Sequence, residues 1–359
     1  MNIRTIERTE KQQWIMPVNK CRCMFIPPIV LENLAKAGIE EARLTIQQSR
    51  LSREKRAKGP ENMEMFAGVT PTGRAHRQIY DSEKKWKQKV KLVRAEGGPL
   101  TGDEAADKSY DHIGNFRDCL KNVFNRNSLD NNGMGLISNV HFGTKYNNAF
   151  WDGDEITFGD GDGKIFVNLT KSLDVVAHEL GHGVVQWTAN FVYSKQPGAL
   201  HEHFADVFGS VVTQYAEGQT AEDADWLIGD EIMGPELYGE ALRSMCAPGT
   251  AYDNDLLGKD PQPDHMRDYY DGPADLGGVH INSGIPNKAF CLVAREIGTE
   301  KAALIWYTAL QRLWSTADFN DAVGQIVKAA RLLVKDGKVE LGSPQKVRGA
   351  FKAVGLPTP

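Results

Sequence analysis

The spacing of the apolar side chains changes near residue 171, and this change limits the folds open to the chain. Between residues 90 and 171 apolar residues alternate in short runs such as KLVRAEG and SNVHFG, and Asp-Gly pairs interrupt NNAFWDGDEITFGDGDGKIFVNL. That pattern predicts strands joined by tight turns, with one helix over YDHIGNFRDCLKNVFNR. From residue 172 onward the apolar period is helical. A β-rich half before a helical half predicts an α+β fold of two lobes with a cleft between them.

Two long helices are expected directly after this change. Ser172 is a suitable N-cap for a helix over LDVVAHELGHGVVQWTAN, and a second helix, LHEHFADVFGSVVTQYAE, should end near Gly218. Residues 218–284 are rich in turn-forming residues, and three helical patterns follow them: NKAFCLVAREIG, KAALIWYTALQRLW and DFNDAVGQIVKAARLLVKDG. The GDGDG run is interpreted as turns, because an EF-hand loop counted from Asp160 would need Glu where Lys171 stands.

The first quarter of the chain has a different composition. Residues 51–90 contain few large apolar side chains and many Lys, Arg, Gly and Pro, so they are expected to form a linker rather than a core. A boundary is therefore predicted between residues 52 and 78. The resulting parts are an N-terminal segment with its linker over 1–60, a β-rich lobe over 78–190 that ends with the HELGH helix, and a helical lobe over 191–359.

Charge and cysteine content exclude several classes of protein. The net charge of -5 gives no electrostatic reason to expect nucleic acid or a membrane as a partner. No run of 18 apolar residues occurs, and the charged start MNIRTIERTEKQQW lacks the apolar core of a signal peptide. We expect a monomer, synthesised in the cytoplasm without a signal peptide, and export by a non-classical route stays open. The five irregularly spaced Cys residues predict free or buried thiols rather than disulfides.

Two histidines in HELGH carry the strongest chemical signal. His178 and His182 are four residues apart on a helix predicted to be buried, so both imidazoles face one side and could share a metal ion. Glu179 would lie beside that ion, where it can act on a water molecule. A helix that merely contains two histidines is the alternative, but two buried imidazoles side by side need partners.

A hydrolytic zinc site takes a third protein ligand and leaves one position for water. The candidates lie in GALHEHFADVFG, and they are His201, Glu202, His203 and Asp206. Glu202 and Asp206 share one helix face, so one could bind the metal while the other accepts the free N–H of a metal-bound histidine.

Taken together, these segments resemble the thermolysin-like zinc metallopeptidases. The resemblance runs in order from residue 79 to 335, through KNVFNRNSLDNNG, YNNAFWDG, FGDGDG, DVVAHELGHG, ALRSM, DLGGVHINSGIPNKAF and IWYTAL. The IPPIVL segment near the N-terminus is most similar to the protealysin-like branch, which has a short propeptide and no signal peptide. The resemblance implies a two-lobed zinc endopeptidase that is made as a zymogen and acts on peptides and proteins.

The resemblance also implies roles for single residues. It makes His178, His182 and Glu202 the zinc ligands and Glu179 the general base. With Glu202 as the ligand, Asp206 is the residue suited to accept the free N–H of a zinc histidine and so to orient it. The positions that match the family's oxyanion-stabilising pair and its orienting carboxylate are Tyr193, His280 and Asp275.

The peptide-binding positions of the family are also matched. Asn148 and Ala149 would offer hydrogen bonds to an extended peptide, and Arg243 would hold a substrate carbonyl. The apolar residues that match its specificity pocket favour Leu, Ile or Phe directly after the scissile bond, and they are Phe166, Leu169, Val175, Ile228 and Leu242.

The sequence departs from the family pattern at several positions. His201 stands where the family usually has Asn beside the second zinc histidine, and Gly181 replaces a common Thr within HELGH. For calcium, the matching or neighbouring carboxylates are Asp174, Asp223, Asp225 and Asp230. Thr213 and Leu227 replace two family Glu residues, and Met233 and Gly234 replace the ligands of a second calcium loop. Calcium affinity follows the number of charged oxygens, so at most one weakened calcium site is expected.

The Pro27-Pro28 pair is the part of the N-terminal segment that matches the family's propeptide. Residues 1 to about 60 are expected to fill the cleft until cleavage removes roughly 55 to 75 residues. Cys23 precedes the pair by four residues, and its approach to the zinc as a thiol ligand is an open alternative.

Two other functions remain to be weighed. A catalytically silent peptide-binding scaffold would have lost Glu179, a zinc ligand or His280, and all of these are present. A zinc aminopeptidase would need an acidic anchor for the substrate's free amine, commonly in a Gly-rich strand motif, and the sequence contains none. An endopeptidase is therefore the preferred prediction.

Overall fold

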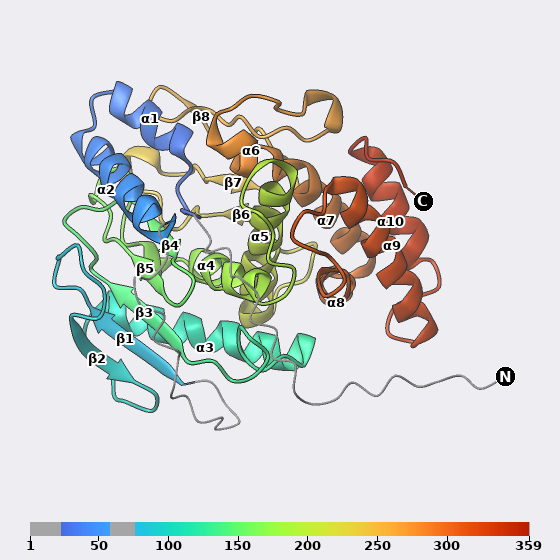
Figure 1. The fold of residues 1–359 in the computed structure, drawn as a ribbon, viewed down its shortest axis with the longest axis horizontal. Helices are drawn as coiled ribbons and strands as arrows, with labels where there is room; N and C mark the ends of the chain where they lie inside the picture. The colour runs from blue at the N-terminus through green and yellow to red at the C-terminus, as the bar shows by residue number, and fades with distance from the viewer. Residues whose placement is uncertain (1–22, 58–75, 359) are drawn as a thin grey trace.

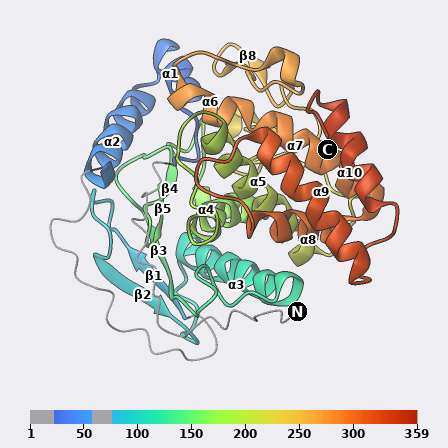
Figure 2. The same ribbon diagram turned by 45° about the vertical axis from the view of Figure 1, so that its right-hand side comes forward.

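The computed structural model describes residues 23–57 and 76–358. The predicted α+β fold is confirmed: a β-rich part lies at one end, a helical part at the other, and two long helices run between them (Figure 1). Figure 2 shows the same arrangement from a second direction, with the N-terminal helix α2 (Glu40–Ala57) on the side of the sheet and α1 (Pro28–Lys36) near α6 and the loop that contains β8.

A five-stranded sheet forms the β-rich part. Its strands have the spatial order β2-β1-β3-β5-β4, in which β1, β3 and β5 are parallel and the edge strands β2 and β4 are antiparallel to their neighbours. The strand bounds are β1 Arg77–Asp81, β2 Lys91–Ala95, β3 Leu136–Val140, β4 Ala149–Trp151 and β5 Ile156–Phe158. Because β4 is an edge strand, its outer side is open to pairing with another peptide.

Helix α3 (Glu104–Phe124) packs against this sheet. The side chain of Asp103 caps its first turn by accepting a hydrogen bond from the N–H of Ala106, and Asn125 ends it in the left-handed conformation. The helix predicted over YDHIGNFRDCLKNVFNR is thus present and begins earlier than expected.

Helices α4 (Leu173–Gln186) and α5 (Lys195–Glu217) form the centre of the molecule. Every residue of α4 is buried, including its polar residues Asp174, His178, Glu179, His182 and Gln186. A Cβ on Gly181 would lie 3.1 Å from Cα of Ala205, so the missing side chain lets α4 and α5 approach closely. Gly218 ends α5 with a φ of 67°, as predicted.

The helical part contains α6 (Asp275–Asn282), α7 (Gly284–Ile297), α8 (Thr299–Leu310), α9 (Phe319–Lys335) and α10 (Ser343–Ala353). The last three helical patterns in the sequence correspond to α7, α8 and α9, whereas α10 was not predicted. The prediction that the cysteines form no disulfide is wrong: Cys246 and Cys291 are joined, with their Cα atoms 5.3 Å apart. This bond ties the loop after β7 (Arg243–Ser244) to α7, and sequence spacing gave no sign of it.

The N-terminal segment folds into α1 (Pro28–Lys36) and α2 (Glu40–Ala57), which pack on each other. The linker predicted over residues 51–90 is therefore wrong in part, because α2 continues to Ala57 and β1 occupies Arg77–Asp81. Residues 58–75 lie outside the described residues. They contain most of the predicted domain boundary and every cleavage point that would remove 58 to 75 residues. The boundary and the cleavage therefore stay predictions.

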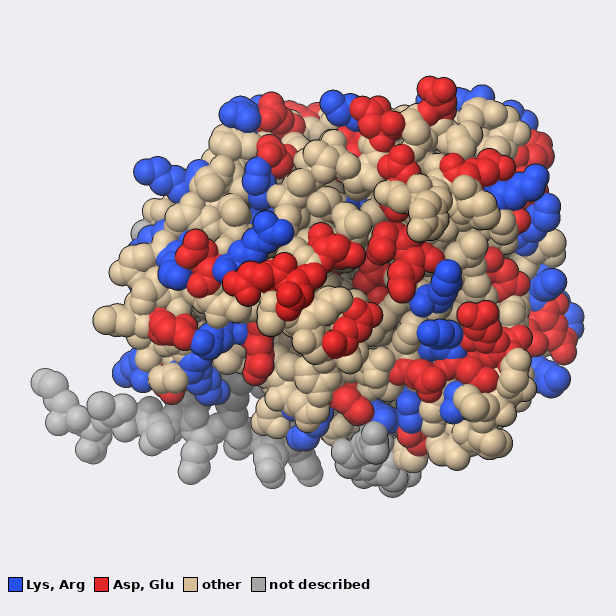
Figure 3. Space-filling view, turned by 180° about the vertical axis from the view of Figure 1, so that it is seen from behind, with Lys and Arg blue, Asp and Glu red and all other residues tan. Residues whose placement is uncertain are grey.

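Short elements complete the described chain. The two-stranded pairs are β6 (Leu227–Ile228) with β7 (Arg243–Ser244), and β8 (Asp253–Asn254) with β9 (Gly258–Lys259). No helix within the described ranges has both the length and the apolar composition needed to cross a bilayer. The surface seen from behind carries both signs of charge, with acidic side chains gathered across its middle (Figure 3).

Candidate active site

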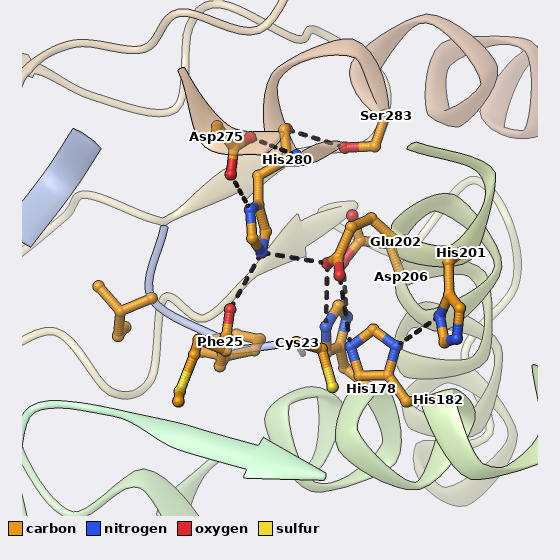
Figure 4. A network of polar contacts seen from close by, with 12 residues as sticks. Cys23, Phe25, His178, His182, His201, Glu202, Asp206, Asp275, His280 and Ser283 are labelled. Atoms are coloured by element: carbon orange, nitrogen blue, oxygen red, sulfur yellow. Dashed lines mark hydrogen bonds and ion pairs between the residues drawn. The ribbon is translucent and has the colours of Figure 1, made fainter. Parts of the chain in front are cut away.

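His178 and His182 from α4 and Glu202 from α5 meet in the interior (Figure 4). Nε2 of His178 lies 3.5 Å from Oε2 of Glu202, and Nε2 of His182 lies 3.6 Å from Oε1. One ligand atom from each residue lies within 4.8 Å of the other two. Both Nε2 atoms and Oε2 of Glu202 are buried and have no hydrogen-bond partner within the described residues. Two nitrogens and one carboxylate oxygen in this state fit a zinc ion.

Each of the two histidines is held through its other ring nitrogen. Nδ1 of His178 lies 2.8 Å from Oδ1 of Asp206, as expected for the acceptor that orients a metal-binding imidazole. Burial alone would raise the pKa of Asp206, but the neighbouring Arg243 and His178 lower it to about 2. Nδ1 of His182 lies 2.9 Å from Nδ1 of His201, so one ring donates and the other accepts. His201 thus occupies the supporting position suggested by the sequence.

Glu179 points into the same space. Both of its carboxylate oxygens are buried, and neither has a hydrogen-bond partner within the described residues. Burial raises the pKa of Glu179 to about 7, although the nearby His178 opposes the rise. A carboxylate with that pKa and two free acceptor atoms is suited to taking a proton from water at neutral pH.

Tyr193, Asp275 and His280 stand opposite these residues. The hydroxyl of Tyr193 donates to Glu202 and lies 3.4 Å from Nε2 of His280. Asp275 binds His280 twice, accepting from the backbone N–H at 2.6 Å and contacting ring Nδ1 at 2.7 Å. Burial by itself would lower the pKa of His280, but Asp275 and Glu202 outweigh it and raise the pKa. Nε2 of His280 lies 3.0 Å from the carbonyl oxygen of Met24, which can only accept, so this nitrogen is the donor.

The first turn of α6 explains how Asp275 reaches His280. Leu276, Gly277 and Gly278 have φ values of 53°, 87° and 79°, so the chain turns through left-handed conformations before the regular helix begins. Glycine adopts such angles without strain, which gives the Gly-Gly pair in this motif a structural role.

The cleft between these groups is occupied by the protein's own residues 23–26. Phe25 donates its N–H to the carbonyl of Ala149 at 3.0 Å, and its carbonyl accepts from Nη1 of Arg243 at 3.4 Å. The Asn148 amide binds Ile26 twice, through its oxygen at 2.8 Å and its nitrogen at 3.3 Å. All three residues predicted to bind the peptide backbone of a substrate thus bind this segment.

The Phe25 side chain fills an apolar site beside the two helices. Its ring lies edge-on to His178 with centroids 5.1 Å apart, and the Arg243 guanidinium lies 4.9 Å from its centroid. Leu242 and Phe25 both approach Gly229 within 3.4 Å of where its Cβ would stand. The five predicted pocket residues are all buried in the main hydrophobic core, which extends through both lobes and also includes Phe25, and they are Phe166, Leu169, Val175, Ile228 and Leu242.

The possible calcium ligands are not brought together. Within the described residues, Asp174, Asp225 and Asp230 belong to no group of carboxylates close enough to share an ion. Both oxygens of Asp174 are already engaged, one by the Ser172 hydroxyl and the other by the N–H of Gly229 at 2.7 Å. The structure gives the calcium hypothesis no support.

Several residues at the site were missed or undervalued. Arg56 of α2 donates to the carbonyls of Cys23, at 3.3 Å, and Trp151, at 2.9 Å. Cys23 itself forms a second compact group with Glu179 and His182, in which one ligand atom of each lies within 4.8 Å of the others. The hypothesis that Cys23 approaches the metal was the one sequence-based prediction related to this group. Nothing in the sequence predicted the hydrogen bonds of Arg56.

His203, the remaining candidate ligand, faces away from the metal group. Its Nδ1 lies 2.7 Å from Oδ1 of Asn287, and its Nε2 accepts from the Trp306 indole at 2.8 Å. Asn287 in turn donates to Asp206 at 2.9 Å, so His203 supports the site indirectly.

Known proteins are similar to this chain in sequence and in fold. A family description, thermolysin metallopeptidase, matches residues 49–186 as its catalytic domain and residues 189–356 as its alpha-helical domain. An extracellular metalloprotease of Pectobacterium carotovorum subsp. carotovorum is 48% identical over 306 residues, covering 83% of this chain and 87% of the relative. Protease PrtS of Photorhabdus sp. (strain Az29) is 45% identical over 296 residues, 80% of each chain.

A solved structure extends the match to the N-terminal segment. The precursor of protealysin, a metalloproteinase from Serratia proteamaculans, has a TM-score of 0.80 and 42% identity, and the match covers 93% of this chain and 100% of that one.

Proposed function

The chain belongs to the thermolysin family of metallopeptidases, and from that premise we propose that it cleaves peptide bonds on the N-terminal side of bulky apolar residues and is made as a zymogen. The family and the protealysin precursor support a zinc metalloendopeptidase. The observation that carries the specificity is Phe25, whose side chain fills the apolar site while its backbone takes the contacts with Ala149 and Arg243.

His178, His182 and Glu202 would hold the zinc. When bound, such an ion polarises a water molecule and lowers its pKa toward about 7. Glu179 takes a proton from that water and later delivers it to the leaving nitrogen, and its two free oxygens and raised pKa suit both steps. Asp206 and His201 keep the two imidazoles oriented through their Nδ1 atoms.

His280 and Tyr193 would stabilise the charge that develops on the substrate carbonyl oxygen. Their donor atoms are 3.4 Å apart, so both can reach one oxygen, and Asp275 keeps His280 oriented and protonated. Removing one such donor typically slows an acyl-transfer reaction about 10²- to 10³-fold. Asn148, Ala149 and Arg243 position the peptide backbone, which leaves specificity to the apolar pocket.

The N-terminal segment would be the enzyme's own inhibitor until cleavage. Residues 23–26 fill every peptide-binding contact described above, so a substrate cannot enter while they are bound. Peptide and protein substrates and this segment are therefore the partners that we propose. Cytoplasmic synthesis with non-classical export, and a monomeric state, stay predictions.

The proposal is tested by hydrolysis of furylacryloyl-glycyl-phenylalanine amide after the N-terminal segment has been removed. We expect activity that a chelator abolishes and added zinc restores, and weak activity when Asp replaces Phe in the substrate. Glu179→Gln should lower kcat by about 10³-fold or more while the protein still binds zinc, because only the proton transfer is removed. Full activity in that variant would overturn the mechanism.

A further inference from the structure

Residues 24 and 25 lie where a substrate would place the two sides of its scissile bond. Phe25 makes the contacts assigned above to the residue after that bond, through Ala149 and Arg243. The carbonyl of the preceding residue, Met24, lies 3.0 Å from Nε2 of His280. This is the carbonyl oxygen on which charge would develop if the Met24–Phe25 bond were attacked.

The thiol of Cys23 lies beside the proposed base and one of the proposed zinc ligands. Sγ of Cys23 lies within 4.8 Å of a carboxylate oxygen of Glu179 and a ring nitrogen of His182, and all three residues are fully buried. Glu179, the proposed base, has no hydrogen-bond partner on either oxygen within the described residues. A water between Glu179 and the carbonyl of Met24 would have to share this space with the sulfur.

The thiol is fixed in this position by the residues around it. Sγ donates to the carbonyl of Trp151 at 3.4 Å, and Arg56 donates to the carbonyls of both Cys23 and Trp151. Trp151 belongs to edge strand β4, whereas Arg56 comes from the last turn of α2. Arg56, in the last turn of α2, therefore holds Cys23 in the cleft.

We propose that residues 23–26 are a bound pseudosubstrate with Met24–Phe25 as the scissile bond, and that the Cys23 thiol protects this bond by excluding the attacking water. The inference rests on the proposed function, since it uses the same base and the same peptide contacts. It assigns a self-cleavage site within the segment, separate from any cleavage in residues 58–75.

Removing the sulfur should turn the inhibitor into a substrate. A water that enters would bond through its oxygen to the carbonyl carbon of Met24, and the carbon–nitrogen bond to Phe25 would break. Glu179 would carry the water's protons to the leaving nitrogen, so the products are a Met24 carboxylate and a Phe25 ammonium group. No oxidant or other reactant is needed.

The test uses the full-length chain with zinc and follows its mass and its new N-termini with time. Cys23→Ala should release residues 1–24 at least about tenfold faster than the wild type, at a rate independent of protein concentration, because the bond lies in the chain's own cleft. Cys23→Ala with Glu179→Gln should stay intact. Cys119→Ala, which removes another fully buried cysteine, on α3 and outside the compact group of Cys23, Glu179 and His182, should behave like the wild type.

Amide hydrogen exchange gives a readout that needs no activity. In the Glu179→Gln background the N–H of Phe25 should be protected by the Ala149 carbonyl, with either Cys or Ala at position 23. If Cys23→Ala keeps this protection but leaves Met24–Phe25 uncut, the inference fails. Loss of the protection in Cys23→Ala also overturns it, since the sulfur would then anchor the segment rather than exclude water.

Failure of the inference can be told apart from failure of the proposed function. The same preparation, freed of its N-terminal segment, is assayed with the furylacryloyl dipeptide amide. An inactive mature chain would refute the proposed function, whereas an active mature chain with an uncut Cys23→Ala precursor would refute the pseudosubstrate alone. Rapid cleavage of Met24–Phe25 in the wild type would refute the protective role of the thiol.

Discussion

The helix pair α4–α5 and the N-terminal segment meet at the same buried site, but different forces hold them there. The helix pair is joined by close packing, since Gly181 lets the two backbones approach and every residue of α4 is buried. The segment is buried at residues 23–27, along part of α1, and at four positions of α2, which are Ala42, Thr45, Ser49 and Arg56. In the zymogen that we propose, the helix pair belongs to the permanent catalytic body and the segment is the removable inhibitor.

The contacts of α2 support this view. They are largely polar: the Thr45 hydroxyl accepts from the N–H of Asn147 at 3.1 Å, Ser49 lies 3.0 Å from the Tyr146 hydroxyl, and Glu41 pairs with an exposed Lys145 at 2.7 Å. The first two contacts are buried and each contributes about 0.5–1.5 kcal/mol net, because water replaces them when the partners separate, and the exposed Lys145 pair contributes about 0–1 kcal/mol. We therefore expect the residues in the cleft, which bury an aromatic side chain, to contribute most of the attachment.

The largest effect should come from Phe25→Asp. A carboxylate in the apolar site would lose its water, and the nearest cation, Arg243, is already paired with Asp206, so the change costs several kcal/mol. We expect the peptidase activity of the intact precursor to rise by about 10³-fold, which corresponds to about 4 kcal/mol of lost binding free energy.

Phe25→Leu provides the matched control, since it keeps a bulky apolar side chain, and the precursor should stay latent. The measurement is hydrolysis of the furylacryloyl dipeptide amide by chains shown by mass to be uncleaved. If Phe25→Asp remains as latent as the wild type, the cleft residues are not the main attachment, and α2 holds the segment instead.

The sequence predicted the permanent body better than the removable segment. His178, His182 and Glu202 lie on two helices, and helical spacing fixes which side chains share a face, so local pattern was enough to bring them together. The register of Phe25 depends on Ala149 and Arg243, which are more than a hundred residues away, and no local pattern encodes it. Strand β1 was missed because the residues around position 80 are rich in charge, and its place in the sheet is set by pairing with β3, which is distant in the sequence.

Other features depended on tertiary contacts. The Cys246–Cys291 bond joins residues separated by 45 positions whose Cα atoms approach only in the folded chain. His201 could be recognised as a supporting residue from the resemblance, but its pairing with Nδ1 of His182 required the geometry of α4 against α5.

A smaller effect is expected within the permanent body. In Gly181→Ala the new Cβ would lie 3.1 Å from both Cα of Ala205 and Cβ of Phe208, so the helices must move apart slightly. Overpacking a core costs about 1–3 kcal/mol, and the better helix propensity of Ala returns up to about 1 kcal/mol. We expect the free energy of unfolding to fall by about 1–2 kcal/mol.

Gly324→Ala is the control for this variant. Gly324 lies within α9, and its Cβ would meet no atom within 4 Å, so the same substitution should stabilise the protein by about 0.5–1 kcal/mol. Both variants are measured by denaturant unfolding of the catalytic body, and both should keep the precursor latent. Equal stability of the two variants would show that α4 and α5 are not closely packed at Gly181.

The smallest effect concerns a charge pair within the body and a second one at the segment interface. Nδ1 of His141 lies 2.7 Å from Asp160, and Nε2 lies 3.0 Å from Asp103, the N-cap of α3. The hydrogen bond to Asp160 raises the pKa of His141 to about 9 despite partial burial. The folded state therefore holds a proton more tightly than the unfolded chain, whose histidine has a pKa near 6.5.

The stabilisation from His141 is complete below about pH 6.5 and is lost as the pH rises through about 9. His141→Asn, chosen because position 141 has a φ of 53° that Asn tolerates, should lower the free energy of unfolding by about 1 kcal/mol near pH 6 and by much less near pH 10. Lys145→Gln, which breaks the exposed pair with Glu41, should change unfolding little at either pH. A His141→Asn effect that is constant with pH would mean that the imidazole acts through packing and not through its charge.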